Sequence, residues 1–273
     1  MAGGSWTTQN KVLPGVYIRF KTKGALGLNV GERGVVTICE PLSWGPVAKV
    51  TEVTTDMDLT PIIGYDITDP KARFLQEIFK GSNRTSPPTR VLLYRPSASS
   101  AAKAAVTEGT LTATARYEGA RGNDISIIVT ALTEPEDSFL VSTVVDGAVM
   151  DQQTGKTVED LTANDWVAFS GSGALSATTG AALTGGNDGT VAATAYSAYL
   201  TAIEPYKFDV MIYDGSDGTV QTAMLSFIKR MNDENGQRCQ LCASGLSAPD
   251  TRYVIHVNSP VKLADGTELT KEQ

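Results

Sequence analysis

The feature that most constrains the fold is a change of pattern along the chain. Before residue 96 and after residue 185, apolar segments typical of strands alternate with amphipathic helical patterns. Between these positions strand patterns follow one another, and only a short helical turn around 157–161 is indicated. Alternating strands and helices favour an α/β layer, whereas strands alone favour a separate β-rich domain. We therefore predict a mixed α+β and α/β fold, in which an α/β sandwich-like domain is interrupted by an inserted β-rich domain.

The two flanking parts contain the clearest helices. The first begins after Asp69, which can cap it, with Pro70 at the first helical position and Gly81 as the C-terminal stop. Two further helical patterns cover 196–203 and 220–231, and the second is the strongest amphipathic stretch of the chain. Strand patterns occupy 33–40, 47–55, 90–95, 208–213, 238–243 and 252–257. We expect the two flanking parts to meet in a single sheet.

The inserted part is expected to be built from strands. The segments 110–118 and 125–130 are expected to pair as a hairpin with a long loop, and further strands are expected over 139–145 and 166–169. The stretch 171–189 consists almost entirely of small residues, so it is expected to be a connector. An insertion of this kind at a surface loop costs little stability.

The predicted organisation has four parts: an extended N-terminal arm (1–21), a first α/β part (22–95), the inserted β-rich domain (96–185) and a second α/β part (186–273). Near the end, Asp265-Gly266 has the signature of a hairpin turn. Thr270-Lys-Glu-Gln273 then matches the pattern that opens a helix, without a helical body after it. We therefore expect the second α/β part to be truncated, and a frayed tail is the alternative.

The arm ends in a strand pattern. Apolar and polar side chains alternate there, with Val16, Ile18 and Phe20 on the apolar side, and Pro14 disfavours a helix. A terminal strand of this kind either starts the sheet of its own chain or completes the sheet of a neighbouring chain. On these residues alone the first alternative is the more common one, and both stay open.

Composition excludes several classes of function. The chain has 23 Lys and Arg against 30 Asp and Glu, and its net charge of −7 argues against nucleic acid or an anionic membrane surface as the main partner. No apolar stretch is long enough to cross a bilayer, and the basic-then-apolar pattern of a signal peptide is not seen. These features favour synthesis and folding in a cytoplasm.

The sharpest chemical motif is Cys239-Gln-Leu-Cys242. A redox pair needs its first cysteine at a helix N-terminus, whereas this pair follows a helix C-terminus and lies in a strand pattern that points its side chains to opposite faces. His256 lacks the companions of a zinc site or a catalytic triad. Residues 155–157 lack the upstream glycine of a phosphate-binding loop, and 214–218 lack the bidentate glutamate of a calcium loop. We predict no catalytic residue, no cofactor and no metal site.

Four sets of motifs carry a resemblance to a known family. They are Trp6-Thr-Thr-Gln-Asn-Lys-Val-Leu-Pro-Gly-Val-Tyr17, Arg33-Gly-Val-Val with Trp44-Gly-Pro46, Tyr117-Glu-Gly-Ala-Arg-Gly-Asn-Asp-Ile125, and Thr184-Gly-Gly-Asn-Asp-Gly189. Over nearly the whole chain, and in the right order, the sequence resembles the contractile tail sheath proteins of prophages and phage-tail-like bacteriocins from Gram-positive bacteria. Family members continue well past position 273, so the resemblance implies that the family's C-terminal segment is missing here.

The resemblance implies a structural subunit and not an enzyme. Sheath subunits polymerise around a tail tube and contract to drive it through a cell envelope, using energy stored in subunit contacts. In the family, N-terminal and C-terminal arms of neighbouring subunits augment the sheet of a third subunit. The resemblance therefore favours an arm that completes the sheet of a neighbouring chain. The residues that would lend this strand are Leu13, Pro14, Gly15, Val16, Tyr17, Ile18, Arg19 and Phe20.

The resemblance also implies the partners and the location. The partners are further copies of the chain in a helical homopolymer, the tail tube protein and baseplate proteins, with no nucleic acid and no membrane insertion. The location is the tail of a virion or phage-like particle, after synthesis in the cytoplasm of a bacterial host. Two other hypotheses compete with this one: a cytoplasmic thiol-redox enzyme that uses Cys239 and Cys242, and a β-rich surface adhesin.

Overall fold

The structure is a computed structural model, and it describes residues 34–81, 86–134, 136–246, 250–263 and 266–271. The predicted arm strand, Leu13 to Phe20, lies outside the described residues. Within the described ranges, no helix has the length and apolar character that crossing a membrane requires.

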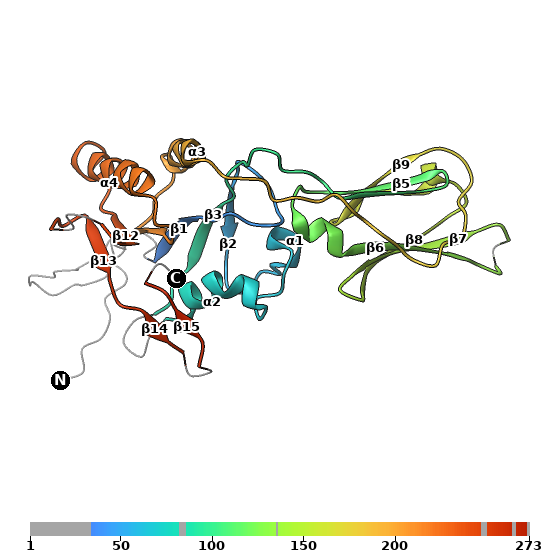
Figure 1. The fold of residues 1–273 in the computed structure, drawn as a ribbon, viewed down its shortest axis with the longest axis horizontal. Helices are drawn as coiled ribbons and strands as arrows, with labels where there is room; N and C mark the ends of the chain where they lie inside the picture. Colours follow the sequence, from blue (N-terminus) through green and yellow to red (C-terminus); the bar gives the residue numbers. More distant parts are fainter. Residues whose placement is uncertain (1–33, 82–85, 135, 247–249, 264–265, 272–273) are drawn as a thin grey trace, which may run out of the picture. The chain divides into compact units, whose positions relative to one another are not determined.

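The main sheet has six strands in the order β13-β12-β11-β1-β3-β2 (Figure 1). Their bounds are Val254–Val257 (β13), Gln240–Ser244 (β12), Val210–Tyr213 (β11), Val35–Cys39 (β1), Arg90–Tyr94 (β3) and Val50–Val53 (β2). Neighbouring strands from β13 to β3 are parallel, and β2 is antiparallel to β3 at the edge. Strands from both flanking parts of the sequence therefore share one sheet, as predicted.

Helices cover the two faces of this sheet (Figure 1). Helices α3 (Ala193–Ile203) and α4 (Gly218–Asp233) share a hydrophobic core with one face, and α2 (Arg73–Lys80) packs on the other. Strand β3 shows the division, because Leu92 and Tyr94 lie in the core with α3 and α4, whereas Val91 and Leu93 lie in the core with α2. A strand buried on both faces reads as a continuous apolar run, which is the pattern of 91–94.

The helix starts follow the sequence rules. Asp69 accepts a hydrogen bond from the Lys71 backbone N–H at 2.8 Å, and Pro70 begins the short 3₁₀ helix η1 (Pro70–Ala72) that leads into α2. Asp217 caps α4 in the same way, with its carboxylate 2.7 Å from the Thr219 backbone nitrogen. The first cap was predicted. A short helix, α1 (Thr60–Ile63), was not.

The inserted part consists of two sheets that face each other across one core. One sheet has the order β4-β5-β9 and the other β10-β6-β7-β8. Their bounds are Ala105–Glu108 (β4), Leu111–Ala115 (β5), Val167–Gly171 (β9), Ala181–Ala182 (β10), Ile125–Ala131 (β6), Phe139–Val145 (β7) and Ala148–Gly155 (β8). Strand β5 alternates buried and partly exposed residues, and its buried residues, Leu111, Ala113 and Ala115, share a core with Ile125, Ile127 and Val129 of β6. This is the two-layer packing of a β-sandwich.

Two predictions for the inserted part are wrong in detail, and two strands were missed. Segments 110–118 and 125–130 do not form a hairpin, since β5 pairs with β4 and β9 whereas β6 pairs with β7 and β10. The 3₁₀ helix η2 (Ala120–Asp124) carries the chain from one sheet to the other. The expected connector 171–189 contains strand β10 and two buried core residues, Leu175 and Leu183. Strands β4 and β8 were not predicted.

The end of the described chain forms the predicted hairpin, with β14 (Val261–Lys262) antiparallel to β15 (Glu268–Leu269). Thr270 and Lys271 follow it and are not helical. The remaining two residues of the predicted helix start lie outside the described ranges.

Candidate functional site: the joint between the two domains

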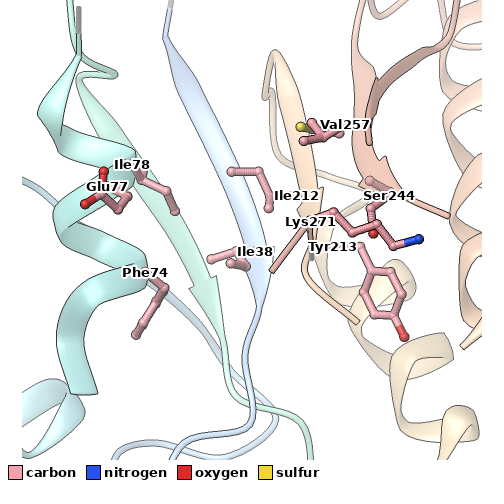
Figure 2. A pocket seen from close by; sticks show the side chains of 11 residues that line it. Ile38, Phe74, Glu77, Ile78, Ile212, Tyr213, Ser244, Val257 and Lys271 are labelled. Atoms are coloured by element: carbon pink, nitrogen blue, oxygen red, sulfur yellow. The ribbon is translucent and has the colours of Figure 1, made fainter. Parts of the chain in front are cut away.

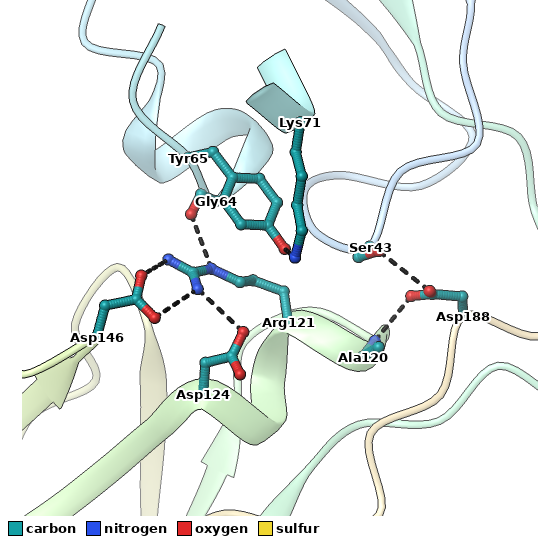
Figure 3. Close-up of polar contacts among 9 residues, drawn as sticks. All are labelled: Ser43, Gly64, Tyr65, Lys71, Ala120, Arg121, Asp124, Asp146 and Asp188. Carbon is teal, nitrogen blue, oxygen red and sulfur yellow. Dashed lines mark hydrogen bonds and ion pairs between the residues drawn. The ribbon is translucent and has the colours of Figure 1, made fainter. Parts of the chain in front are cut away.

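Segments far apart in the sequence meet where the α/β domain joins the β-sandwich. We call this region the joint (Figure 3). The α/β domain contributes Ser43, Trp44, Gly45, Gly64, Tyr65 and Arg95, and the sandwich contributes Tyr117 to Asn123, Asp146 and Asp188. Most of these residues belong to the motifs on which the family resemblance rests.

Trp44 anchors the α/β domain in the core of the sandwich. It follows β1 in the chain, yet it is 0% exposed and its hydrophobic cluster is that of the sandwich. Its ring lies 5.3 Å from that of Tyr117, edge to face, and 5.0 Å from that of Trp166. Aromatic pairs in such geometries add to the stabilisation that burial alone provides. Through this single side chain, the two domains share apolar surface.

Arg121 makes the reverse connection, from the sandwich into the α/β domain (Figure 3). Its side chain is 5% exposed and donates from Nε to the Gly64 carbonyl at 2.9 Å. The guanidinium also lies 4.3 Å from the centre of the Tyr65 ring. The two terminal guanidinium nitrogens donate hydrogen bonds to carboxylates of the sandwich. Both oxygens of Asp146 accept such bonds, and Asp124 accepts one at 3.0 Å. Every face of this buried cation therefore has a partner.

The electrostatics of this group favour the charged forms. Burial lowers the pKa of Arg121, but the hydrogen bonds that Arg121 donates to Asp146 and Asp124 outweigh burial and leave the pKa raised. The same hydrogen bonds lower the pKa of Asp146. Both shifts favour the charged forms of Arg121 and Asp146, so these two residues act as a fixed ion pair.

Further polar contacts tie the backbones of the two domains together. Arg95, at the end of β3, donates to the Gly45 carbonyl at 2.8 Å and to the Glu118 carbonyl at 2.9 Å. Asp188 accepts from the Ser43 hydroxyl at 3.0 Å and from the Ala120 backbone N–H at 2.7 Å (Figure 3). The segment that leads into the sandwich and the segment that leads out of it are also hydrogen-bonded to each other. Ser99 and Thr190 exchange backbone hydrogen bonds of 2.9 and 3.0 Å.

The glycines of the motif at 117–125 are required by close approach. Gly119 has φ of +128°, and a Cβ there would lie 2.1 Å from the Ser43 carbonyl oxygen. A Cβ on Gly122 would lie 2.9 Å from that of Ala104, a close contact inside the sandwich itself. At Gly119, only glycine allows the backbone of one domain to approach the other this closely. The motif is therefore explained by the joint: an aromatic anchor, glycines for contact and one buried arginine.

The other candidate is an apolar groove of about 270 Å³ on the α2 side of the main sheet (Figure 2). Its lining is mostly apolar: Ile38, Phe74, Ile78, Ile212, Ala243 and Val257. Cys242 and Ser244 also line it, but the lining contains no histidine, and its one carboxylate, Glu77, pairs with Lys80 at 3.2 Å. Lys271 lines the groove as well, and the buried Ser244 Oγ makes no hydrogen bond to it or to any other described residue.

The two cysteines of the CxxC motif lie on opposite faces of the main sheet, as predicted. Cys239 packs in the core with α3 and α4, whereas Cys242 lines the groove on the α2 side. Burial raises the pKa of Cys239 to about 11 and also raises the pKa of Cys242. Both shifts are opposite to what a redox thiol needs. The thiol-redox hypothesis has no structural support.

Native thiols should therefore react slowly. At neutral pH a thiol with a pKa of about 11 has roughly a hundredfold less thiolate than an unperturbed cysteine. We expect iodoacetamide to label Cys239 at least 100-fold more slowly in the native protein than in urea, as measured by mass spectrometry. Fast labelling of Cys239 in the folded protein would restore the redox hypothesis.

The remaining motifs of the sequence have structural roles. His256 is exposed on the edge strand β13. Thr157 forms a capping box with Asp160 at the 3₁₀ helix η3 (Val158–Asp160), directly after Lys156. Asp217, in the stretch considered for calcium, caps α4. Across the described parts of the chain, no three His, Cys, Asp or Glu side chains cluster closely enough to hold a metal ion.

The fold and the joint define a class of protein: an α/β domain that carries an inserted β-sandwich. Three family models match the chain in this order. They are the tail sheath protein Gp18 domain III N-terminal region (residues 33–86), the phage tail sheath protein beta-sandwich domain (97–188) and the phage tail sheath protein central domain (189–273). The chain belongs to the phage tail sheath proteins.

Individual relatives agree with this assignment. The chain is 33% identical to the phage-like element PBSX protein XkdK of Bacillus subtilis and 35% identical to the uncharacterized protein YqbK of the same organism, with 100% of the chain and 61% of each relative covered. A solved sheath tail protein from Desulfitobacterium hafniense matches with a TM-score of 0.83 and 41% identity over 94% of the chain and 59% of that protein. One from Listeria innocua matches with a TM-score of 0.75 and 29% identity over 89% and 54%. The chain thus spans about three fifths of the length of its relatives.

Sequence reasoning did not predict the joint as a site. The residues it selected, Leu13 to Phe20, lie outside the described ranges and stay a prediction. The signal that could have found the joint was present in the motif at 117–125, where two glycines flank an arginine next to an aromatic residue. A buried arginine needs acceptors, and glycines at such spacing indicate close backbone approach.

Proposed function

We propose that the protein is a non-enzymatic structural subunit of a contractile tail sheath, which polymerises around a tail tube and contracts to drive it through a cell envelope. The observation that carries this proposal is the match to three sheath domains in order over most of the chain. The energy would come from the difference between two sets of subunit contacts. The joint supports this view, because a subunit that transmits force between neighbours needs its domains firmly connected.

We further propose that the arm, with Leu13, Pro14, Gly15, Val16, Tyr17, Ile18, Arg19 and Phe20, adds a strand to the sheet of a neighbouring copy. An available edge supports this proposal. Strand β13 ends the main sheet, and no other strand pairs with its outer edge among the described residues. Its side chains Ile255 and Val257 are 42% and 37% exposed. An exposed edge with apolar side chains is a template for strand addition.

The proposed partners follow from this function. They are other copies of the chain, the tail tube protein and the baseplate, with no nucleic acid and no membrane insertion. The protein would act in the tail of a virion or phage-like particle after synthesis in the cytoplasm of its bacterial host. We also propose the division into an arm (1–21), two α/β parts (22–95 and 186–273) and an inserted domain (96–185).

A double substitution in the arm tests the proposal. Val16→Asp with Ile18→Asp places two charges on the apolar side of the strand, so we expect the full-length protein to lose assembly into material that pellets in the ultracentrifuge. The melting temperature of the unassembled subunit should stay nearly unchanged, because the strand leaves its own domain. The matched control is Arg19→Ser with Lys21→Ser on the opposite side.

Two outcomes would contradict the arm proposal. A collapse of subunit stability in the double variant would place the strand in the sheet of its own chain. Unchanged assembly would show that the apolar side of the arm makes no contact between subunits.

A further inference from the structure

The turn that joins α4 to β12 contains the pair Asn235-Gly236, which the sheath function does not use (Figure 1). Helix α4 ends at Asp233, and both residues of the pair are exposed and lie outside any helix or strand. Asn235 is the only asparagine of the sequence that a glycine follows. Because an asparagine side chain can react with the backbone nitrogen of the next residue, this pair can modify itself without an enzyme.

The surroundings of Gly236 leave room for this reaction. Gly236 has φ of +68°, and a Cβ built at this position would meet no described atom within 4 Å. The Gly236 backbone N–H makes no hydrogen bond to any of the residues that the structure describes. The attacking nitrogen is therefore exposed, and the absence of a side chain leaves space for the ring that the attack closes.

The Asn235 side chain is only weakly held. Its amide nitrogen donates to the Met231 sulfur at 3.3 Å, and a thioether sulfur is a weak acceptor. The Asn235 backbone N–H lies 3.4 Å from the Arg230 carbonyl oxygen, which is longer than most backbone hydrogen bonds. Turning the side chain towards the Gly236 nitrogen therefore gives up little binding energy.

The other described asparagines each lack at least one of these features. Asn232, in the last turn of α4, donates to the Ile228 carbonyl at 2.9 Å and to the Cys239 carbonyl at 2.8 Å, so its amide is fixed. Asn258 is exposed, but a serine follows it. In three further cases the side chain is hydrogen-bonded to the backbone and an aspartate follows: Asn123, Asn164 and Asn187.

We propose that Asn235-Gly236 is a site of spontaneous deamidation. The Gly236 backbone nitrogen attacks the side-chain carbonyl carbon of Asn235, and a new carbon–nitrogen bond forms. The bond from that carbon to Nδ2 breaks, and the amide group leaves as ammonia together with the proton of the attacking nitrogen. Water then opens the succinimide ring at one of its two carbonyls, which leaves aspartate or isoaspartate at position 235. Water is the only co-reactant, and no electrons are exchanged.

The product is unfavourable where it forms. A carboxylate at position 235 adjoins Asp233 and Glu234 and follows the C-terminal end of α4, where the helix dipole disfavours negative charge. Isoaspartate also adds a methylene to the backbone of the turn, which is held by a hydrogen bond from the Gln237 backbone N–H to the Met231 carbonyl at 2.9 Å. Deamidation should therefore lower the melting temperature of the protein.

Peptide mapping by mass spectrometry tests the proposed site in the folded protein. The purified chain is incubated at mildly alkaline pH, below its melting transition, and the loss of each amide is followed over time. We expect Asn235 to react at least about tenfold faster than Asn232 and Asn258, which corresponds to a barrier lower by about 1.4 kcal/mol. Asn232 is the matched control for a fixed amide, and Asn258 is the control for exposure without a following glycine. A rate for Asn235 no higher than that of either control overturns the proposal.

A pair of variants tests the product. An isoaspartate-specific methyltransferase should label the aged wild type. Asn235→Gln keeps an amide but would have to close a larger ring, so we expect it to lose most of the label and to keep its melting temperature during ageing. Asn258→Gln should be labelled, and should lose melting temperature, like the wild type. Equal labelling of the two variants overturns the proposal. These measurements use the unassembled subunit, so their outcome is independent of the sheath function.

Discussion

Replacing Trp44 with alanine is expected to lower the free energy of unfolding by about 3–5 kcal/mol, the range seen when a buried tryptophan is removed from a core. The side chain is 0% exposed and contacts the rings of Tyr117 and Trp166. Its loss would leave a cavity between the two domains that neither domain can close alone. Urea denaturation followed by far-UV circular dichroism measures the change.

Trp44→Phe provides the graded control. Phenylalanine keeps part of the ring contact with Tyr117, so the loss should be clearly smaller than for alanine. Near-UV circular dichroism of the alanine variant should also show that the environment of the other tryptophans has changed, since Trp166 lies 5.0 Å away. An alanine variant that is destabilised by less than about 1 kcal/mol, the effect of an ordinary substitution, would contradict the role of Trp44 as an anchor.

Arg121→Met is expected to cost about 2–3 kcal/mol. Methionine keeps most of the aliphatic stem, but the buried Gly64 carbonyl loses its donor, and leaving such a group unsatisfied costs about 1–3 kcal/mol. The contact with the Tyr65 ring is lost as well. The carboxylates left behind cost less than a fully buried ion would, because Asp146 and Asp124 are 61% and 45% exposed and can be hydrated.

Arg116→Met is the matched control for this prediction. Arg116 is also an arginine of the sandwich paired with an aspartate, Asp165, at 2.7 Å, but both side chains are largely exposed. Exposed pairs contribute at most about 1 kcal/mol, so this variant should unfold close to the wild type. Equal destabilisation of the two variants would show that burial of Arg121 at the joint has no special role.

Local patterns were sufficient for the elements whose environment is uniform along the chain. The run Val91 to Tyr94 is apolar throughout because β3 is buried on both faces, and Asp69 with Pro70 marks a helix start by chemistry that involves only neighbouring residues. The amphipathic pattern of 220–231 likewise matches α4, whose buried residues face one core. The overall fold class followed from these elements.

The elements that sequence reasoning missed are those decided by distant partners. Strand β8 carries Asp151, Gln152 and Gln153 and alternates poorly, because it lies at the edge of its sheet and most of its residues are exposed. Strand β5 was assigned to the wrong partner, because its neighbour β9 follows only after the strands of the other sheet. Pairing across such distances depends on tertiary packing, which local propensity does not encode.

The joint was missed for the same reason. Trp44 contacts Tyr117 and Arg121 contacts Gly64, and in each case the partner lies in the other domain. The residues adjacent to Trp44 and Arg121 in the sequence do not indicate these contacts. The family motifs indicated that these segments matter. The structure adds the physical reason, which is that they hold the two domains together.

The most direct test of the central claim, that this protein works as a polymerising structural subunit, is electron microscopy of the purified full-length protein. By negative stain we expect tubes or stacked rings in the wild type and single particles in the variant with Val16→Asp and Ile18→Asp. A full-length protein that remains monomeric at high concentration would contradict the claim.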